Sequence, residues 1–158
     1  MQKKQIHWGK VILAGVLATV IGFVLEGLLY SASNGVYASY GDLPYAKPVE
    51  SLPAYLATMM GGSVILTVLF ALIYALIRDG LPGQRAWQKG LSFGLILLAV
   101  YMLPTAFNTW MQIAQPLTLI LLEAVNRTIG LLVQAVIIAL VYGMGSAISS
   151  AGQGLPAS

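Results

Sequence analysis

The sequence predicts an all-α fold: an integral membrane bundle of four transmembrane helices. One observation is composition, because 58% of the residues are hydrophobic and only 8% are charged, whereas soluble domains carry about 25% charged residues. The mean hydropathy of +0.84 agrees. A second observation is that four apolar stretches are each long enough to supply the roughly 20 residues that a spanning helix needs. These stretches leave no room for a soluble domain, so residues 1–158 are predicted to form a single membrane domain.

The predicted spans cover about residues 8–30, 52–77, 86–107 and 117–142. The first two are joined by "SASNGVYASYGDLPYAKPVES", whose Gly, Pro, Ser and Asn content predicts an irregular loop. The second and third are joined by "RDGLPGQRAWQKG", which predicts a tight turn. Small and polar residues at 146–158 predict a mobile tail.

The first span is expected to be retained and not cleaved as a signal peptide. Lys3 and Lys4 precede an apolar run that continues from Val11 to Tyr30. The apolar core of a signal peptide is usually only about 7 to 15 residues long. We therefore interpret this run as a spanning helix.

Basic residues are distributed unequally between the two sides of the predicted bundle. The N-terminus and the second connection hold six of them, and the opposite side holds only Lys47. The six are Lys3, Lys4, Lys10, Arg78, Arg85 and Lys89. The positive-inside rule then predicts that both termini are cytoplasmic, in the inner membrane if the source is bacterial. The basic turn would attract anionic headgroups as an ordinary consequence of this topology.

One face of the first span is lined by small residues. Gly15, Thr19, Gly22 and Glu26 follow one another at i, i+4, i+7 and i+11, which places them on one side of a helix. Small residues let helix backbones approach closely in a membrane. We therefore predict helix packing at Gly15, Thr19 and Gly22, and at Gly130 on a similar stripe of the last span.

Glu123 and Arg127 interrupt the apolar run of the last span, with Asn126 beside them. An arginine at the bilayer centre costs at least about 2.5 to 3.5 kcal/mol on insertion scales, so Arg127 needs a partner. Glu123 lies one turn away, and Glu26 is estimated to lie at a similar depth from a rise of about 1.5 Å per residue. An intramembrane salt bridge among the three groups is predicted.

The third span adds Tyr101, Thr105 and Asn108 at the same depth, next to Pro104, which either kinks the helix there or marks its end near an interface. The resulting candidate site for a ligand or ion contains seven residues: Glu26, Tyr101, Thr105, Asn108, Glu123, Asn126 and Arg127. Three interpretations remain open. The cluster pins the helices in register, or it marks a proton, ion or ligand site, or it docks another subunit.

Several chemistries are excluded by composition. The chain has no cysteine and one histidine, His7, which lies at the opposite end of the first span from Glu26. Thiolate catalysis, cysteine-bound metals and His-rich zinc sites are therefore not expected. No glycine-rich phosphate loop occurs, and the basic residues do not form a nucleic-acid-binding face. No catalytic residue, metal, cofactor or nucleic-acid partner is predicted.

The segments "HWGKVILAG" and "EGLLYS" in the first span, "LIYALIRDGLPG" at the basic turn and "LLEAV" in the last span carry a resemblance. The chain resembles a loose group of small bacterial four-helix membrane proteins that contain a domain of unknown function. The resemblance implies the fold and no activity. In that group an acid near the outer end of the first helix and another in the last are common, which Glu26 and Glu123 match, whereas Arg127 has no place in the pattern.

The function expected from the sequence is that of a non-catalytic small integral membrane protein, an accessory or interaction subunit of a membrane assembly. The alternative is a small proton-coupled carrier or ligand-binding membrane protein that uses Glu26, Glu123 and Arg127. Its expected partners are the lipid bilayer and either other membrane subunits or further copies of itself. An enzyme acting on a lipid or quinone ranks last, because a nucleophile with a base is missing.

Overall fold

A computed structural model describes residues 6–39, 51–112 and 115–151, and the regular elements within these ranges are all helices. In chain order they are α1 (Trp8–Ala38), α2 (Leu52–Ile77), α3 (Ala86–Leu97), the π-helix η1 (Leu98–Met102), α4 (Leu103–Gln112) and α5 (Leu117–Ala151). Four helical segments are long and apolar enough to cross a membrane: Trp8–Ala38, Leu52–Ile77, Ala86–Gln112 and Leu117–Met144. The all-helical, four-segment prediction is confirmed.

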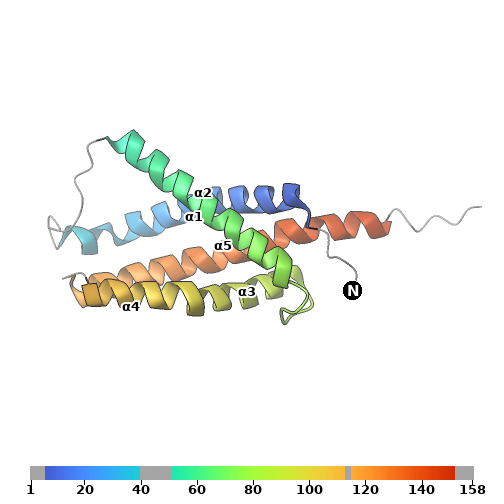
Figure 1. The fold of residues 1–158 in the computed structure, drawn as a ribbon. Helices are drawn as coiled ribbons and strands as arrows, with labels where there is room; N and C mark the ends of the chain where they lie inside the picture. Colours follow the sequence, from blue (N-terminus) through green and yellow to red (C-terminus); the bar gives the residue numbers. More distant parts are fainter. Residues whose placement is uncertain (1–5, 40–50, 113–114, 152–158) are drawn as a thin grey trace, which may run out of the picture.

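Helix α5 is the centre of the arrangement. It runs between α1 on one side and the continuous α3, η1 and α4 segment on the other (Figure 1). α1 begins and α5 ends at the same end of the bundle, as an even number of crossings requires (Figure 1). α2 packs on α1 through its second half and crosses the others obliquely, so its first half stands apart. Residues 51–62 are accordingly all exposed.

Three helices are longer than predicted. α1 continues to Ala38, the third segment continues to Gln112, and α5 continues to Ala151. The predicted irregular loop therefore begins later than residue 31, and the tail predicted to be mobile from residue 146 is helical through residue 151. In α1 the Ser33 hydroxyl donates a hydrogen bond of 2.8 Å to the Leu29 carbonyl, which lets a polar residue continue a helix. Residues 40–50 and 152–158 lie outside the described residues.

The contact between α1 and α2 is built on one glycine and two threonines. A Cβ atom at Gly15 would lie 2.7 Å from Val68 Cα, so only glycine permits this approach of the two backbones. The buried hydroxyls of Thr19 and Thr67 hydrogen-bond to each other. They lie 2.9 and 3.0 Å from the Gly15 carbonyl oxygen, which they surround. Gly15 and Thr19, predicted to pack helices, both lie in this contact.

A second close contact joins α3 to α5. A Cβ atom at Gly90 would lie 2.7 Å from Val136 Cα, and one at Gly94 would lie 3.2 Å from Ala135 Cβ. The two glycines are four residues apart and face the same helix. This Gly-x-x-x-Gly spacing is the small-residue pattern of close helix packing, and the sequence analysis did not assign Gly90 to it.

Buried aromatic rings fill the bundle near the end where α1 begins. The ring of Tyr74 on α2 meets Phe93 on α3 at 5.4 Å and Tyr142 on α5 at 6.1 Å, both in edge arrangements. The outward face of each of the four segments carries exposed Leu and Ile side chains. Apolar surface on all sides is the pattern of a bundle surrounded by lipid.

Candidate functional site

The contact between α1 and α5 is reciprocal, because each helix places a polar side chain over a glycine of the other. The Glu26 side chain lies over Gly130, where an added Cβ would be 2.9 Å from Glu26 Oε1. One turn away, the Gln134 side chain lies over Gly22. The antiparallel register of the two helices brings both pairs together. Gly22 and Gly130, predicted as packing positions, thus provide the space that Glu26 and Gln134 occupy.

The divergence of α2 opens a crevice of about 210 Å³ in which all four segments take part. Glu26, Arg127 and Gln134 line it from α1 and α5, and Tyr101 and Thr105 line it from the third segment. The α2 side contributes Met59, Ser63, Leu66, Thr67 and Phe70. The crevice therefore combines one acid, one guanidinium and one amide with an apolar wall.

A second cavity, of about 250 Å³, lies between the third segment and α5. Arg127 and Thr105 line it as they line the crevice, and Glu123 joins them. Glu123 Oε1 accepts a hydrogen bond of 3.3 Å from Gln115 Nε2 on the chain that leads into α5. Arg127 therefore lines two cavities, with Glu26 in one and Glu123 in the other.

The predicted intramembrane salt bridge is not present among the described residues 6–39, 51–112 and 115–151. The ion pair recorded there is Arg78 Nε to Asp79 Oδ1, at 3.4 Å, at the turn between α2 and α3. Glu26 and Arg127 are exposed and within electrostatic range of each other, and Glu123 is half-buried. Each acid therefore lines a cavity together with Arg127 but forms no ion pair with it.

Glu26 and Glu123 were expected to lie at the same depth, but in the structure they lie at different levels along the bundle. Glu26 lies opposite Gly130, and Asn126 Nδ2 donates a hydrogen bond of 3.3 Å to Ser33 Oγ. Along the axis of α5, Glu123 is therefore about two helical turns away from the level of Glu26. The prediction placed the end of the first span too early, whereas α1 continues beside α5 to Ala38.

Three polar residues of the third segment were also predicted to line the site. Tyr101 and Thr105 do so, and the Thr105 hydroxyl donates a bond of 2.7 Å to the Tyr101 carbonyl. The Tyr101 ring packs edge-on against Phe70 of α2 at 5.6 Å. Asn108 is exposed and lines neither cavity. Asn126 lines neither as well, because it joins α5 to α1 through Ser33.

The third segment changes its hydrogen-bonding pattern beside the cavities. Leu98–Met102 forms a π-helix in which the Leu103 amide donates to the Leu98 carbonyl. Pro104 follows directly and has no amide hydrogen for the Val100 carbonyl, which favours such a local rearrangement. Met102 at the end of the π-helix lines both cavities. The sequence left open whether Pro104 kinks the helix or marks its end; the helix continues to Gln112, and the π form was not predicted.

Three further polar residues in the crevice were not assigned to the site from the sequence. Gln134 lies two turns after Arg127 on the same face of α5, and Ser63 and Thr67 form one stripe on α2. Their helical spacing in the sequence already indicated that they share a face with other polar residues of the same helix. What the spacing could not show is that α2 meets α5 across an open crevice at this level.

The crevice can hold a polar group by hydrogen bonds and by two charges of opposite sign. Within the described part of the chain, His, Asp and Glu form no group of three that could hold a metal ion. The fold and the crevice together define a class: a helical bundle of four apolar segments, each able to cross a membrane, with a polar crevice beside a diverging helix. Comparisons with protein-family models, with curated proteins and with solved structures found no match for the chain.

Proposed function

We propose that the protein is a non-catalytic integral membrane protein that acts as an accessory or interaction subunit of a membrane assembly. The observation that carries this proposal is the exposure of Glu26 and Arg127 at the open crevice. Glu26 lies roughly 24 Å along α1 from Lys10. With Lys10 at the boundary of a hydrocarbon layer about 30 Å thick, Glu26 would lie inside that layer. Ionisable groups at such depth face a bundle interior or a water-filled cavity and not acyl chains.

The diverging half of α2 supports the same proposal. Residues 51–62 are all exposed, and an added Cβ at Gly61 or Gly62 would meet nothing within 4 Å. A neighbouring helix could therefore approach α2 closely at these glycines. Such a helix, from another subunit or from a second copy, would cover the crevice from the lipid side.

We further propose that the protein resides in a cytoplasmic membrane with both termini facing the cytoplasm. The support is the unequal distribution of basic residues, six against one. The resemblance to small bacterial membrane proteins favours a bacterial inner membrane.

Photo-crosslinking in native membranes tests the accessory role. A photoreactive amino acid replaces Met59, which lines the crevice, or Leu95, which is 58% exposed on α3 and lines neither cavity. We expect a single adduct of defined mass from position 59 and none from position 95. Native mass spectrometry of the gently extracted protein should give an assembly of fixed stoichiometry. A monomer, with equal crosslinking at the two positions, would refute the proposal.

A small proton-coupled carrier or ligand-binding protein is the second candidate. It is favoured by the arrangement of one guanidinium, Arg127, between two cavities that each contain an acid. A proton or ligand could pass from Glu26 to Glu123 beside it. In this case water, and not a partner helix, would solvate the charges in the crevice.

Flux measurements in liposomes separate the two candidates. For a carrier, Glu26→Gln should abolish a proton-dependent flux. Asp79→Asn should leave the flux intact, because Asp79 lies in the turn after α2 and lines neither cavity. An accessory subunit should show no flux in either protein. Flux that survives Glu26→Gln would exclude the crevice as the pathway.

A further inference from the structure

A second cluster of charged side chains lies at the end of the bundle where α1 begins, and none of its residues lines the crevice. Its centre is the ring of Tyr142 on α5. The Arg78 guanidinium carbon lies 4.9 Å from the centre of this ring, and Lys10 Nζ lies 6.0 Å from it. Two cations from α1 and from the end of α2 therefore share one aromatic ring, at distances typical of cation–π contacts.

A third cation comes from α3. Lys89 Nζ donates a hydrogen bond of 3.0 Å to the Arg78 carbonyl oxygen, which ties the start of α3 to the end of α2. The acid at this end is Asp79, which is 69% exposed and lies 3.4 Å from Arg78 Nε. Three cations against one carboxylate leave the cluster positive. A guanidinium group such as that of Arg78 can donate two parallel hydrogen bonds to a bidentate anion.

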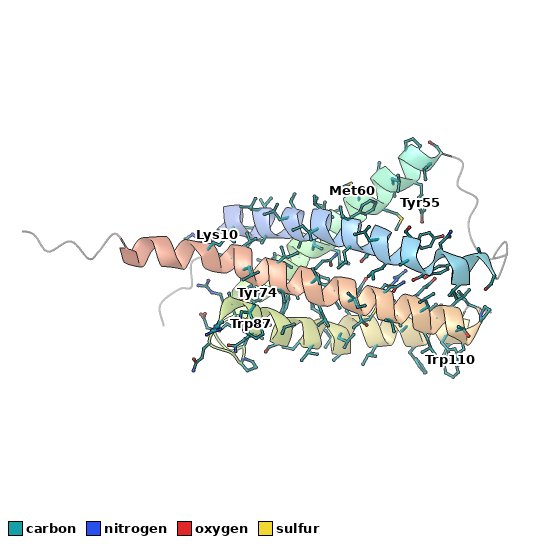
Figure 2. The ribbon with its side chains drawn as sticks, turned by 180° about the vertical axis from the view of Figure 1, so that it is seen from behind. Lys10, Tyr55, Met60, Tyr74, Trp87 and Trp110 are labelled. Atoms are coloured by element: carbon teal, nitrogen blue, oxygen red, sulfur yellow. The ribbon has the colours of Figure 1, made fainter. Side chains whose placement is uncertain are left out.

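Buried aromatic rings lie beneath the cluster. Tyr142 and Tyr74 are each only 3% exposed, and their rings pack edge-on below the cations. The indole rings of Trp8, at the start of α1, and of Trp87, at the start of α3, are exposed. Figure 2 shows Lys10 and Trp87 toward one end of the bundle and Trp110 at the other. Indole rings at helix ends are typical of the headgroup region of a bilayer.

We propose that Lys10, Arg78 and Lys89 form, with Tyr142, a binding site for the phosphate of an anionic phospholipid. Like charges that converge on one ring repel each other unless an anion offsets them. A phosphodiester supplies that anion and accepts two bonds from a guanidinium. Basic pockets between membrane helices bind such headgroups. Exposed Leu76 and Ile77, on the last turn of α2, offer an apolar surface for the acyl chains.

Native mass spectrometry of the full chain in detergent tests this site. The delipidated protein is titrated with phosphatidylglycerol, with phosphatidylcholine, or with inorganic phosphate. We expect retention of one phosphatidylglycerol molecule, and weaker binding of phosphatidylcholine and inorganic phosphate. Lys10→Gln and Arg78→Gln should each raise the dissociation constant for phosphatidylglycerol about fivefold, the factor that corresponds to one basic residue near an anionic headgroup.

Arg85→Gln is the matched control, because it removes the same charge from the same turn, where Arg85 is exposed and is not among the cations that lie over the Tyr142 ring in the described part of the chain. Its effect should be below about twofold. Equal weakening by Arg85→Gln and Arg78→Gln would show only diffuse attraction and overturn the site. Equal affinity for phosphatidylcholine, or saturation by inorganic phosphate that excludes the lipid, would overturn it too. If Arg78→Gln does not fold, Lys10→Gln decides the result alone.

Discussion

Gly15→Ala tests the close approach of α1 and α2. The added Cβ would lie 2.6 to 2.8 Å from the Cγ2, Cα and N atoms of Val68, two of which belong to the backbone. A side chain could rotate away, but the backbone of α2 must retreat by roughly 0.7 Å to restore ordinary contact. That movement would stretch the hydrogen bond of 3.0 Å from Thr67 to the Gly15 carbonyl. Overpacking of this kind costs about 1 to 3 kcal/mol.

The free energy of unfolding in detergent micelles measures this effect. Denaturant titration followed by tryptophan fluorescence gives the midpoint and the slope of the transition. Gly27→Ala is the control, because it lies on the same helix and its Cβ would meet nothing within 4 Å. We expect a lower midpoint for Gly15→Ala at unchanged slope, and an unchanged or higher midpoint for Gly27→Ala, which gains up to about 1 kcal/mol from the better helix propensity of alanine. Equal midpoints for the two variants would refute the proposed close contact.

Two further predictions concern the same bundle. Thr67→Ala should lower the free energy of unfolding by about 0.6 to 1.7 kcal/mol, because its buried hydroxyl joins two helices. Thr58→Ala should have no effect in the same titration, since that hydroxyl bonds only within its own helix; similar losses would contradict the assignment. Because the chain has no cysteine, single-cysteine variants report topology: a membrane-impermeant thiol reagent should label Ser39→Cys in intact cells and Arg85→Cys only after permeabilisation. The reverse pattern would invert the proposed orientation.

Helical periodicity made much of the candidate site predictable. Glu26 and Gly22 share one face of α1, and Gly130 and Gln134 share one face of α5, because residues four apart lie on the same side of a helix. The structure places these faces in contact. The contact of Gly15 and Thr19 with α2 follows the same pattern of small residues. Periodicity identifies a face without identifying its partner, so the pairing of Glu26 with Gly130 was not predicted.

The sequence by itself determined four apolar helices, because a hydrocarbon layer demands about 20 apolar residues for each crossing and internal backbone hydrogen bonds throughout. The tertiary structure alone decided how these helices slide and diverge. Register along the helix axes depends on where backbones can approach at Gly15, Gly90 and Gly130. That register separates Glu26 from Glu123, opens the crevice beside α2, and gathers Lys10 and Arg78 at Tyr142. These features join residues that are far apart in the chain. Packing between helices brings such residues together, and the periodicity within one helix carries no information about that packing.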